Sequence, residues 1–118
     1  NGFVLRFRRD GLLIFREISG LPEPIVIKPA GFCVWDNGIS VRVAKKSTLK
    51  GTLQIKPLGI AGLKIMRQLG NDLPKNLPVA ALHALPSVWQ TYRKKSHLVA
   101  VKGVLVHEDI EFEDMFSL

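Results

Sequence analysis

The chain has 118 residues, of which 47% are hydrophobic and 23% charged, a composition typical of one folded domain and not of a disordered segment. Residues 1–102 carry 17 basic and five acidic side chains, whereas the last sixteen residues carry five acids and no base, so a body with a net charge of +12 favours a polyanionic partner. No apolar run approaches the roughly 20 residues of a membrane helix, no signal-peptide pattern is present, and the single Cys33 cannot form an internal disulfide, which together fit a cytoplasmic protein.

Alternation of apolar and polar residues predicts short strands throughout the first half of the chain. Residues 3–8 and 12–16 form a predicted hairpin around the turn Arg9-Asp10-Gly11. A tight Asp36-Asn37-Gly38 turn predicts a second hairpin. The strands expected after a proline-containing connector are residues 25–27, 32–35, 39–43 and 53–56. Six short strands separated by turns point to a sandwich or a barrel.

The hydrophobic period then changes to that of a helix. Residues 61–69 place Leu63 and Met66 on one face and are followed by Gly70, which suits a helix C-terminus. Residues 78–85 predict a second short helix that starts at Pro78. The segments expected after the helices are strands at 87–90, 98–101 and 104–107, and then a solvated acidic tail from residue 108. The predicted fold is therefore α+β, a small strand-dominated sandwich or barrel-like sheet with two short helices, in one domain covering residues 1–118.

The apolar phases of these strands also predict the core. Trp35 and Trp89 sit in apolar strands, so core packing is favoured over a role as exposed stacking platforms, and Cys33 is expected in the core for the same reason. The residues expected to be largely buried are Leu13, Phe15, Val34, Trp35, Val41, Leu53, Ile55, Leu85, Trp89, Val99 and Val101.

The inventory of catalytic residues is poor. His83, His97 and His107 are widely spaced and Cys33 is alone, so neither a Cys-x-x-Cys nor a His-x-x-x-His metal-binding spacing occurs, and no metal site is expected. No serine lies in a Gly-x-Ser-x-Gly elbow, and no Gly-x-x-x-x-Gly-Lys-Ser/Thr loop is present. We therefore expect no catalytic residues in this chain.

Three segments, taken in order, resemble the C-terminal part of tRNA(Ile)-lysidine synthetases, particularly the form found in alphaproteobacteria. The first is residues 12–22 (LLIFREISGLP), followed by the Trp-Asp-Asn-Gly turn at 35–38. The second is residues 55–63 (IKPLGIAGL), a basic-Pro-Leu-Gly-x-x-Gly helix start. The third is residues 77–89 (LPVAALHALPSVW), which leads to the Leu-Val-Ala-Val strand at 98–101. The resemblance covers nearly the whole chain.

The resemblance implies a function for the full-length protein. Such enzymes are ATP-dependent ligases that adenylate the wobble cytidine of a minor isoleucine tRNA and attach lysine to it. ATP and magnesium would serve the full-length enzyme, with no cofactor in this part. The catalytic Ser-Gly-Gly-x-Asp-Ser loop of the family has no match here, and the sequence starts at Asn1-Gly2-Phe3, so we expect the catalytic domain to lie upstream. The resemblance gives this part a role in tRNA binding and substrate choice, with tRNA and the upstream catalytic domain as its partners.

Basic residues fall into three groups that could contact phosphates, which would give affinity and position but little sequence readout. The amides of the glycine-containing helix start could also meet a phosphate, although a tight strand-to-helix turn explains the same glycines. Many relatives carry arginines around residues 80–84, where this chain is apolar, whereas its segment at 93–95 is unusually basic. The candidate tRNA-contacting residues are Lys45, Lys46, Lys50, Lys56, Gly59, Gly62, Lys64, Arg67, Arg93, Lys94 and Lys95.

Two other functions remain open at the level of sequence. The chain could be a protein-interaction or dimerisation domain without RNA contact, with its acidic-apolar tail pairing along a sheet edge of a neighbour. An independent small enzyme is disfavoured by the poor catalytic inventory. RNA binding predicts strong salt dependence of retention on a polyanion column, whereas an apolar interface predicts little.

Overall fold

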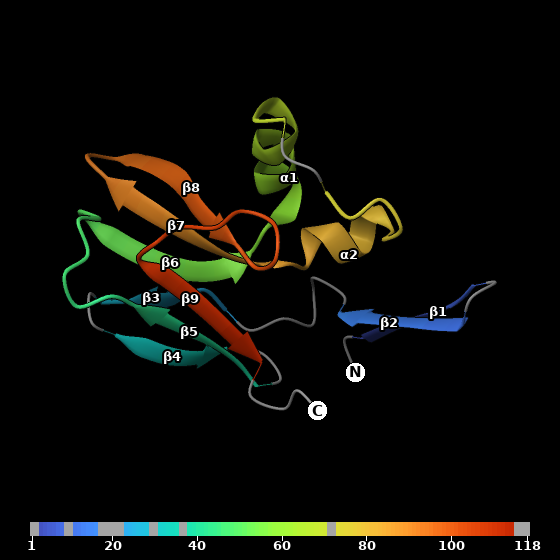
Figure 1. The fold of residues 1–118 in the computed structure, drawn as a ribbon. Coiled ribbons are helices and arrows are strands. Elements are labelled where there is room, and N and C mark those ends of the chain that lie inside the picture. Colours follow the sequence, from blue (N-terminus) through green and yellow to red (C-terminus); the bar gives the residue numbers. More distant parts are fainter. Residues whose placement is uncertain are drawn as a thin grey trace.

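The structure is a computed structural model that describes residues 3–8, 11–16, 23–28, 31–35, 38–70 and 73–114, with side chains described from Glu23 onward. The predicted connector up to residue 22, the turn positions Arg9-Asp10 and Asp36-Asn37, and the side chains of Leu13 and Phe15 therefore lie outside the described residues. Figure 1 shows a strand-rich molecule with two short helices on one side, as the sequence predicts.

Two antiparallel sheets form the body of the molecule. In the four-stranded sheet, the order is β3 (Ile25–Ile27), β6 (Thr52–Pro57), β7 (Pro86–Tyr92) and β8 (Lys95–Val101). In the three-stranded sheet, the order is β4 (Phe32–Trp35), β5 (Ile39–Val43) and β9 (Ile110–Asp114). The predicted hairpin at 32–43 is confirmed, with Trp35 opposite Ile39.

The main core lies between the two sheets, because both contribute side chains to it. Alternate residues of each strand point inward, as the strand period of two requires. The buried members of this core are Ile27, Trp35, Val41, Val43, Leu53, Ile55, Val88, Ala100 and Ile110. The expected burial of Trp35, Val41, Leu53 and Ile55 is confirmed.

Three expected core residues depart from the prediction: the expected burial of Val34 is wrong, and Val99 and Leu85 are only half-buried. Val34 is 49% exposed, because the pleat of β4 turns Trp35 inward and its neighbour outward. Val99 packs half-buried against the main core, and Leu85 packs half-buried against the second core. Strand phase decides the case of Val34, since hydrophobicity alone does not separate it from Trp35, whereas Leu85 lies between α2 and β7 and outside any strand.

A second core joins the helices to the other face of the four-stranded sheet. Helix α1 (Gly59–Gln68) buries Leu63 and Met66, and α2 (Val79–His83) buries Leu82, against Leu58 and Val101. The predicted first helix is confirmed, and Gly70 follows it at φ +72°, the left-handed conformation that glycine favours after a helix. In the described part of the chain, no helix is long and apolar enough to cross a membrane.

The second helix is shorter than the predicted 78–85. Pro78 is its N-cap and Ala84 its C-cap, and β7 starts directly at Pro86. A residue before proline is pushed out of the helical region, so the helix ends before Leu85.

The C-terminal third departs most from the sequence expectation. The strand expected at 104–107 is wrong, because Gly103 at φ +74° opens a tight turn that returns the Leu105 carbonyl to the Val101 amide at 2.9 Å. The tail, expected to be a solvated segment, instead forms β9, with Ile110 opposite Val43. Its acidic side chains alternate with inward-facing apolar ones, so the tail completes this chain's own sheet.

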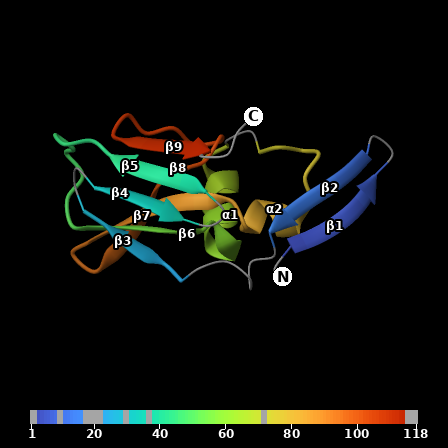
Figure 2. The ribbon, with the colours of Figure 1, turned by 90° about the horizontal axis from the view of Figure 1, so that it is seen from below.

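The predicted N-terminal hairpin is confirmed as β1 (Phe3–Arg8) and β2 (Gly11–Arg16), paired from Phe3 opposite Arg16 to Arg8 opposite Gly11. Figures 1 and 2 both place this hairpin beyond α2, away from the two packed sheets. The hairpin is thus a separate two-stranded sheet.

Two neighbouring residues of β4 test this assignment of faces. Trp35→Ala should lower the free energy of unfolding by about 3 to 5 kcal/mol, because a packed aromatic ring is lost from a side chain that is 1% exposed. Val34→Ala, on the outer face, should change it by about 0.5 kcal/mol or less. Urea unfolding of both variants measures the difference, and equal losses would contradict the described phase of β4.

Candidate nucleic-acid interface

The turn between β7 and β8 is a two-residue turn made of cations. Tyr92 pairs with Lys95 across it, and the intervening Arg93 and Lys94 have φ of +51° and +65°. Two successive positive φ values define the two-residue hairpin turn that normally takes Asn-Gly. Most other side chains, including those of arginine and lysine, are strained at these positions. Each such non-glycine residue costs on the order of 1 kcal/mol or more. Arg93, Lys94 and Lys95 are all exposed.

The loop between β5 and β6 lies beside this turn. The Gln90 side-chain amide donates to the Lys50 carbonyl oxygen at 2.7 Å, which ties the end of the loop to β7. Gly51, at φ +79°, lies so close to β7 that a Cβ there would collide with the Thr91 carbonyl. Lys50 is thereby fixed next to the β7–β8 turn, although more than 40 residues separate them in sequence.

The other end of the loop is held by an acid from the last turn before β9. The Asp109 carboxylate accepts hydrogen bonds from the Ser47 hydroxyl at 2.9 Å and the Thr48 amide at 3.2 Å. The Asp109 carbonyl accepts one from the Ala44 amide at 2.9 Å. Lys45 and Lys46 are exposed on the loop, at the start of a segment anchored at both ends.

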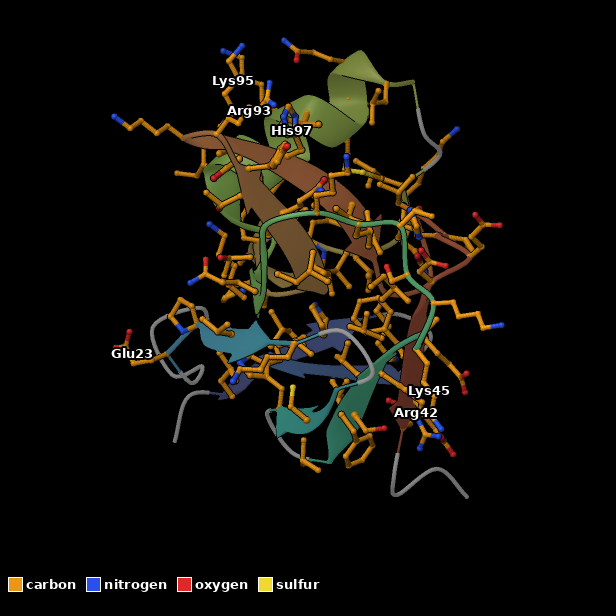
Figure 3. All side chains as sticks on the ribbon, turned by 90° about the vertical axis from the view of Figure 1, so that its left-hand side faces the viewer. Glu23, Arg42, Lys45, Arg93, Lys95 and His97 are labelled. Atoms are coloured by element: carbon orange, nitrogen blue, oxygen red, sulfur yellow. The ribbon has the colours of Figure 1, made fainter. Side chains whose placement is uncertain are left out.

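These two segments gather six predicted site residues at one end of the sandwich, which we call the basic end: Lys45, Lys46, Lys50, Arg93, Lys94 and Lys95. Figure 3 looks onto it, with Arg93, Lys95 and His97 at the hairpin tip and Arg42 and Lys45 together at the opposite corner. Within the described ranges, the single ion pair is Lys102 with Asp114 at 3.1 Å, so none of these six cations is ion-paired there, although Asp109 lies at the loop and Glu111 lies opposite Arg42.

Sequence reasoning missed two residues of this end. Arg42 occupies the outward phase of β5, directly before the loop, and its guanidinium lies 5.4 Å from the centroid of the Phe32 ring. His97 lies opposite Gln90 on β8. The outward phase of each strand was a signal that could have found both.

The remaining predicted cations lie in other places. Lys64 and Arg67 are exposed on α1, at the opposite end of β7, whose seven residues span about 20 Å. Lys56 is half-buried, with its ammonium 4.6 Å from the centroid of the Trp89 ring. Of the groups predicted from sequence, Lys50 therefore lies next to Arg93, Lys94 and Lys95, whereas Lys45 lies at the opposite corner of the same end of the molecule. The third group divides between α1 and the Trp89 ring.

A groove of about 630 Å³ runs between α1 and α2. Its walls combine apolar side chains, two of them well exposed in Ile60 (79%) and Val79 (50%), with the basic Lys64 and Arg67. The other lining residues are Leu63, Gln68 and His83. This groove is less basic than the basic end and more apolar.

The two glycines of the helix start have different roles. Gly59 adopts φ +69°, and a Cβ there would meet nothing within 4 Å, so it lies at an open turn. Gly62 is buried, and its amide donates to the Leu58 carbonyl at 3.1 Å. A Cβ on Gly62 would run into Leu58 and lie 3.1 Å from the Trp89 ring, so this glycine lets α1 approach the sheet.

The tryptophans and the cysteine, which could in principle bind bases or react, serve in packing. The Trp89 indole nitrogen donates to the Ser87 hydroxyl at 2.9 Å, and both tryptophans are buried, which confirms their assignment to the core. Cys33 packs half-buried against the main core, and this burial raises the pKa of its thiol. A raised pKa leaves less thiolate at neutral pH, so the thiol is a poor nucleophile. Among the described residues, no group of three or more potential metal ligands occurs.

Comparison with protein-family models, with curated proteins and with solved structures gives no match to this chain. Function must therefore be argued from the geometry of the basic end together with the resemblance in sequence.

The packing role of Gly62 can be tested directly. Gly62→Ala should lower the free energy of unfolding by about 1 to 3 kcal/mol, because the added methyl group overpacks the contact with Leu58 and Trp89. Ala61→Ser, on the exposed side of the same turn, should change it by about 0.5 kcal/mol or less. Thermal unfolding of the pair provides the measurement. A Gly62→Ala variant as stable as the native chain would mean that α1 stands off from the sheet.

Proposed function

We propose that this chain is the C-terminal, tRNA-handling domain of a tRNA(Ile)-lysidine synthetase, and that it binds tRNA through the basic end. The observation that supports RNA contact is the placement of six exposed cations, from segments far apart in sequence, at one end of the sandwich, where Lys50 adjoins the β7–β8 turn and none of the six forms an ion pair with a described residue. Ordered resemblance over nearly the whole chain supports the choice of enzyme.

The physical role of such a surface is to hold and position the RNA. Lysine and arginine side chains on a polyanion release condensed counterions, which gives affinity that falls steeply with salt. Contacts to phosphate and ribose fix orientation without reading sequence. Adenylation and lysine transfer would take place in the upstream catalytic domain, which would bind ATP and magnesium in the cytoplasm.

A second candidate function is supported by the groove between α1 and α2. Exposed Ile60 and Val79 next to Lys64 and Arg67 suit an amphipathic, acidic protein segment. In this alternative the chain is a protein-interaction or dimerisation domain without RNA contact. The tail remains a candidate for pairing with a neighbour's sheet edge, because β9 pairs with β5 on one side and is the edge strand of its own sheet.

Salt-dependent tRNA binding separates the two functions. Lys45→Gln, Lys46→Gln and Lys50→Gln together should weaken tRNA binding and lower the slope of log affinity against log salt by about 2 to 3, since each lost phosphate contact removes roughly 0.7 to 0.9. Fluorescence anisotropy over a salt series measures both quantities.

The matched control removes three exposed cations from the helix layer, by Lys64→Gln, Arg67→Gln and Lys75→Gln. Its net charge equals that of the first variant, so a difference between them reports location and not total charge. Equal effects of the two variants would mean diffuse attraction, and a native chain that fails to bind tRNA at low salt would favour the protein-docking function.

Catalysis provides a further test of the proposal. The isolated chain should not transfer lysine to tRNA in the presence of ATP, because the family's nucleotide-binding loop has no match in its sequence. A radiolabelled-lysine assay, with a full-length lysidine synthetase as the positive control, measures this. Transfer by the isolated chain would contradict the assignment as a binding domain.

A further inference from the structure

The β7–β8 turn combines two features that each oppose folding. Arg93 and Lys94 occupy two successive positions at φ of +51° and +65°, where Asn-Gly would be relaxed. Three exposed cations, Arg93 to Lys95, also follow one another, with Lys50 on the adjoining loop. Both the backbone strain and the charge repulsion are present in the free protein, and a bound polyanion would remove the repulsion.

Non-glycine residues in left-handed conformations are concentrated where function requires the side chain. Replacement of Arg93 and Lys94 by Asn and Gly would relieve the strain, and since both side chains are exposed it would cost only the contact of Arg93 with the Tyr92 ring. The Arg93 guanidinium instead lies 5.2 Å from the Tyr92 ring centroid, at the tip of the hairpin. An exposed ring contact of this kind is weak, so the strained backbone at both positions still needs an explanation outside the fold.

We propose that the β7–β8 tip grips the sugar-phosphate backbone of duplex RNA, and that Arg93 and Lys94 are retained there at the expense of hairpin stability. The inference rests on the proposed RNA-binding function and assigns its main contact. Phosphate is the expected ligand because all three tip side chains are cations.

A duplex fits the tip better than a single strand. Proteins hold single strands by stacking bases on exposed aromatic rings. The rings near this tip are Tyr92, which is half-buried and already has Arg93 over its ring, and the exposed imidazole of His97, which could hold one base but makes no row of stacking rings. The neighbouring Thr91 and Ser96, whose hydroxyls lie 3.1 Å apart and bond to each other, carry no ring on which a base could stack. Duplex RNA is read by its backbone and shape, which needs cations and no stacking platform.

The test is the double variant Arg93→Asn with Lys94→Gly in the full 118-residue chain. Its melting temperature should rise by about 4 °C or more, because the turn becomes relaxed. Its affinity for an RNA hairpin duplex should fall, with a salt slope lower by about 1.4 to 1.8 for two lost phosphate contacts. The expected result is therefore a higher melting temperature together with a lower affinity for RNA.

Two controls separate strain from charge and duplex from single strand. Arg93→Gln with Lys94→Gln removes the same charge and keeps both side chains at positive φ, so it should lose the same affinity without reaching the melting temperature of the Asn-Gly variant. A single-stranded RNA of the same length should bind the native chain more weakly than the hairpin and should be less affected by both variants.

Each outcome decides a stated point. The Asn-Gly variant could bind duplex RNA as well as the native chain does, while the variant at Lys45, Lys46 and Lys50 binds more weakly. That result would contradict RNA contact at the β7–β8 tip and leave the proposed function intact. A native preference for the single strand would overturn the duplex assignment. Absence of RNA binding by the native chain would contradict both the RNA contact at the β7–β8 tip and the proposed function.

Discussion

Strand β7 is paired on both edges and, over residues 86–89, buried on both faces, and the rest of the structure depends on this. Val88 enters the core between the sheets, and Trp89, the next residue, faces α1. An irregularity in the pairing with β8 lies between these two residues, where Val99 is the extra residue on the partner strand. The indole of Trp89 then meets Gly62, Ser87 and Lys56, so one strand joins the sandwich to the helices.

The same strand carries the candidate site to the far end of the molecule. Because β7 starts beside α2 and ends at the cationic turn, the basic end and the helix groove are held apart. Pairing of β6 with β7 places Thr52 opposite Thr91 and brings the Lys50 loop next to the turn. The apolar groove and the polar, cationic end are thus separate surfaces that suit different partners. In the proposed enzyme, this separation would let RNA occupy one end while the helix side remains open for contact with protein.

Local patterns in the sequence were sufficient for most of the secondary structure. Alternation identified the strands of the first half, and Gly38 and Gly70 marked a turn and a helix end because both adopt positive φ. The pattern failed where tertiary contacts decide. The tail pairs with β5 some 70 residues away, and the apolar run at 104–107 closes a tight turn. For the site, sequence identified the cations, but only the folded structure shows that the Lys50 loop is tied to β7 next to the cationic turn and that Lys56 lies against the Trp89 ring.

The proposed contact of RNA with the basic end is tested most directly by NMR mapping of the residues that RNA touches. Titration of unmodified tRNA into the isotopically labelled chain should shift the backbone amides of residues 44–51 and 91–97, with the largest changes at Arg93 to Lys95. Amides of α1 and α2 should remain unchanged. Shifts confined to residues 60–68 and 79–83, which line the helix groove, would contradict the account.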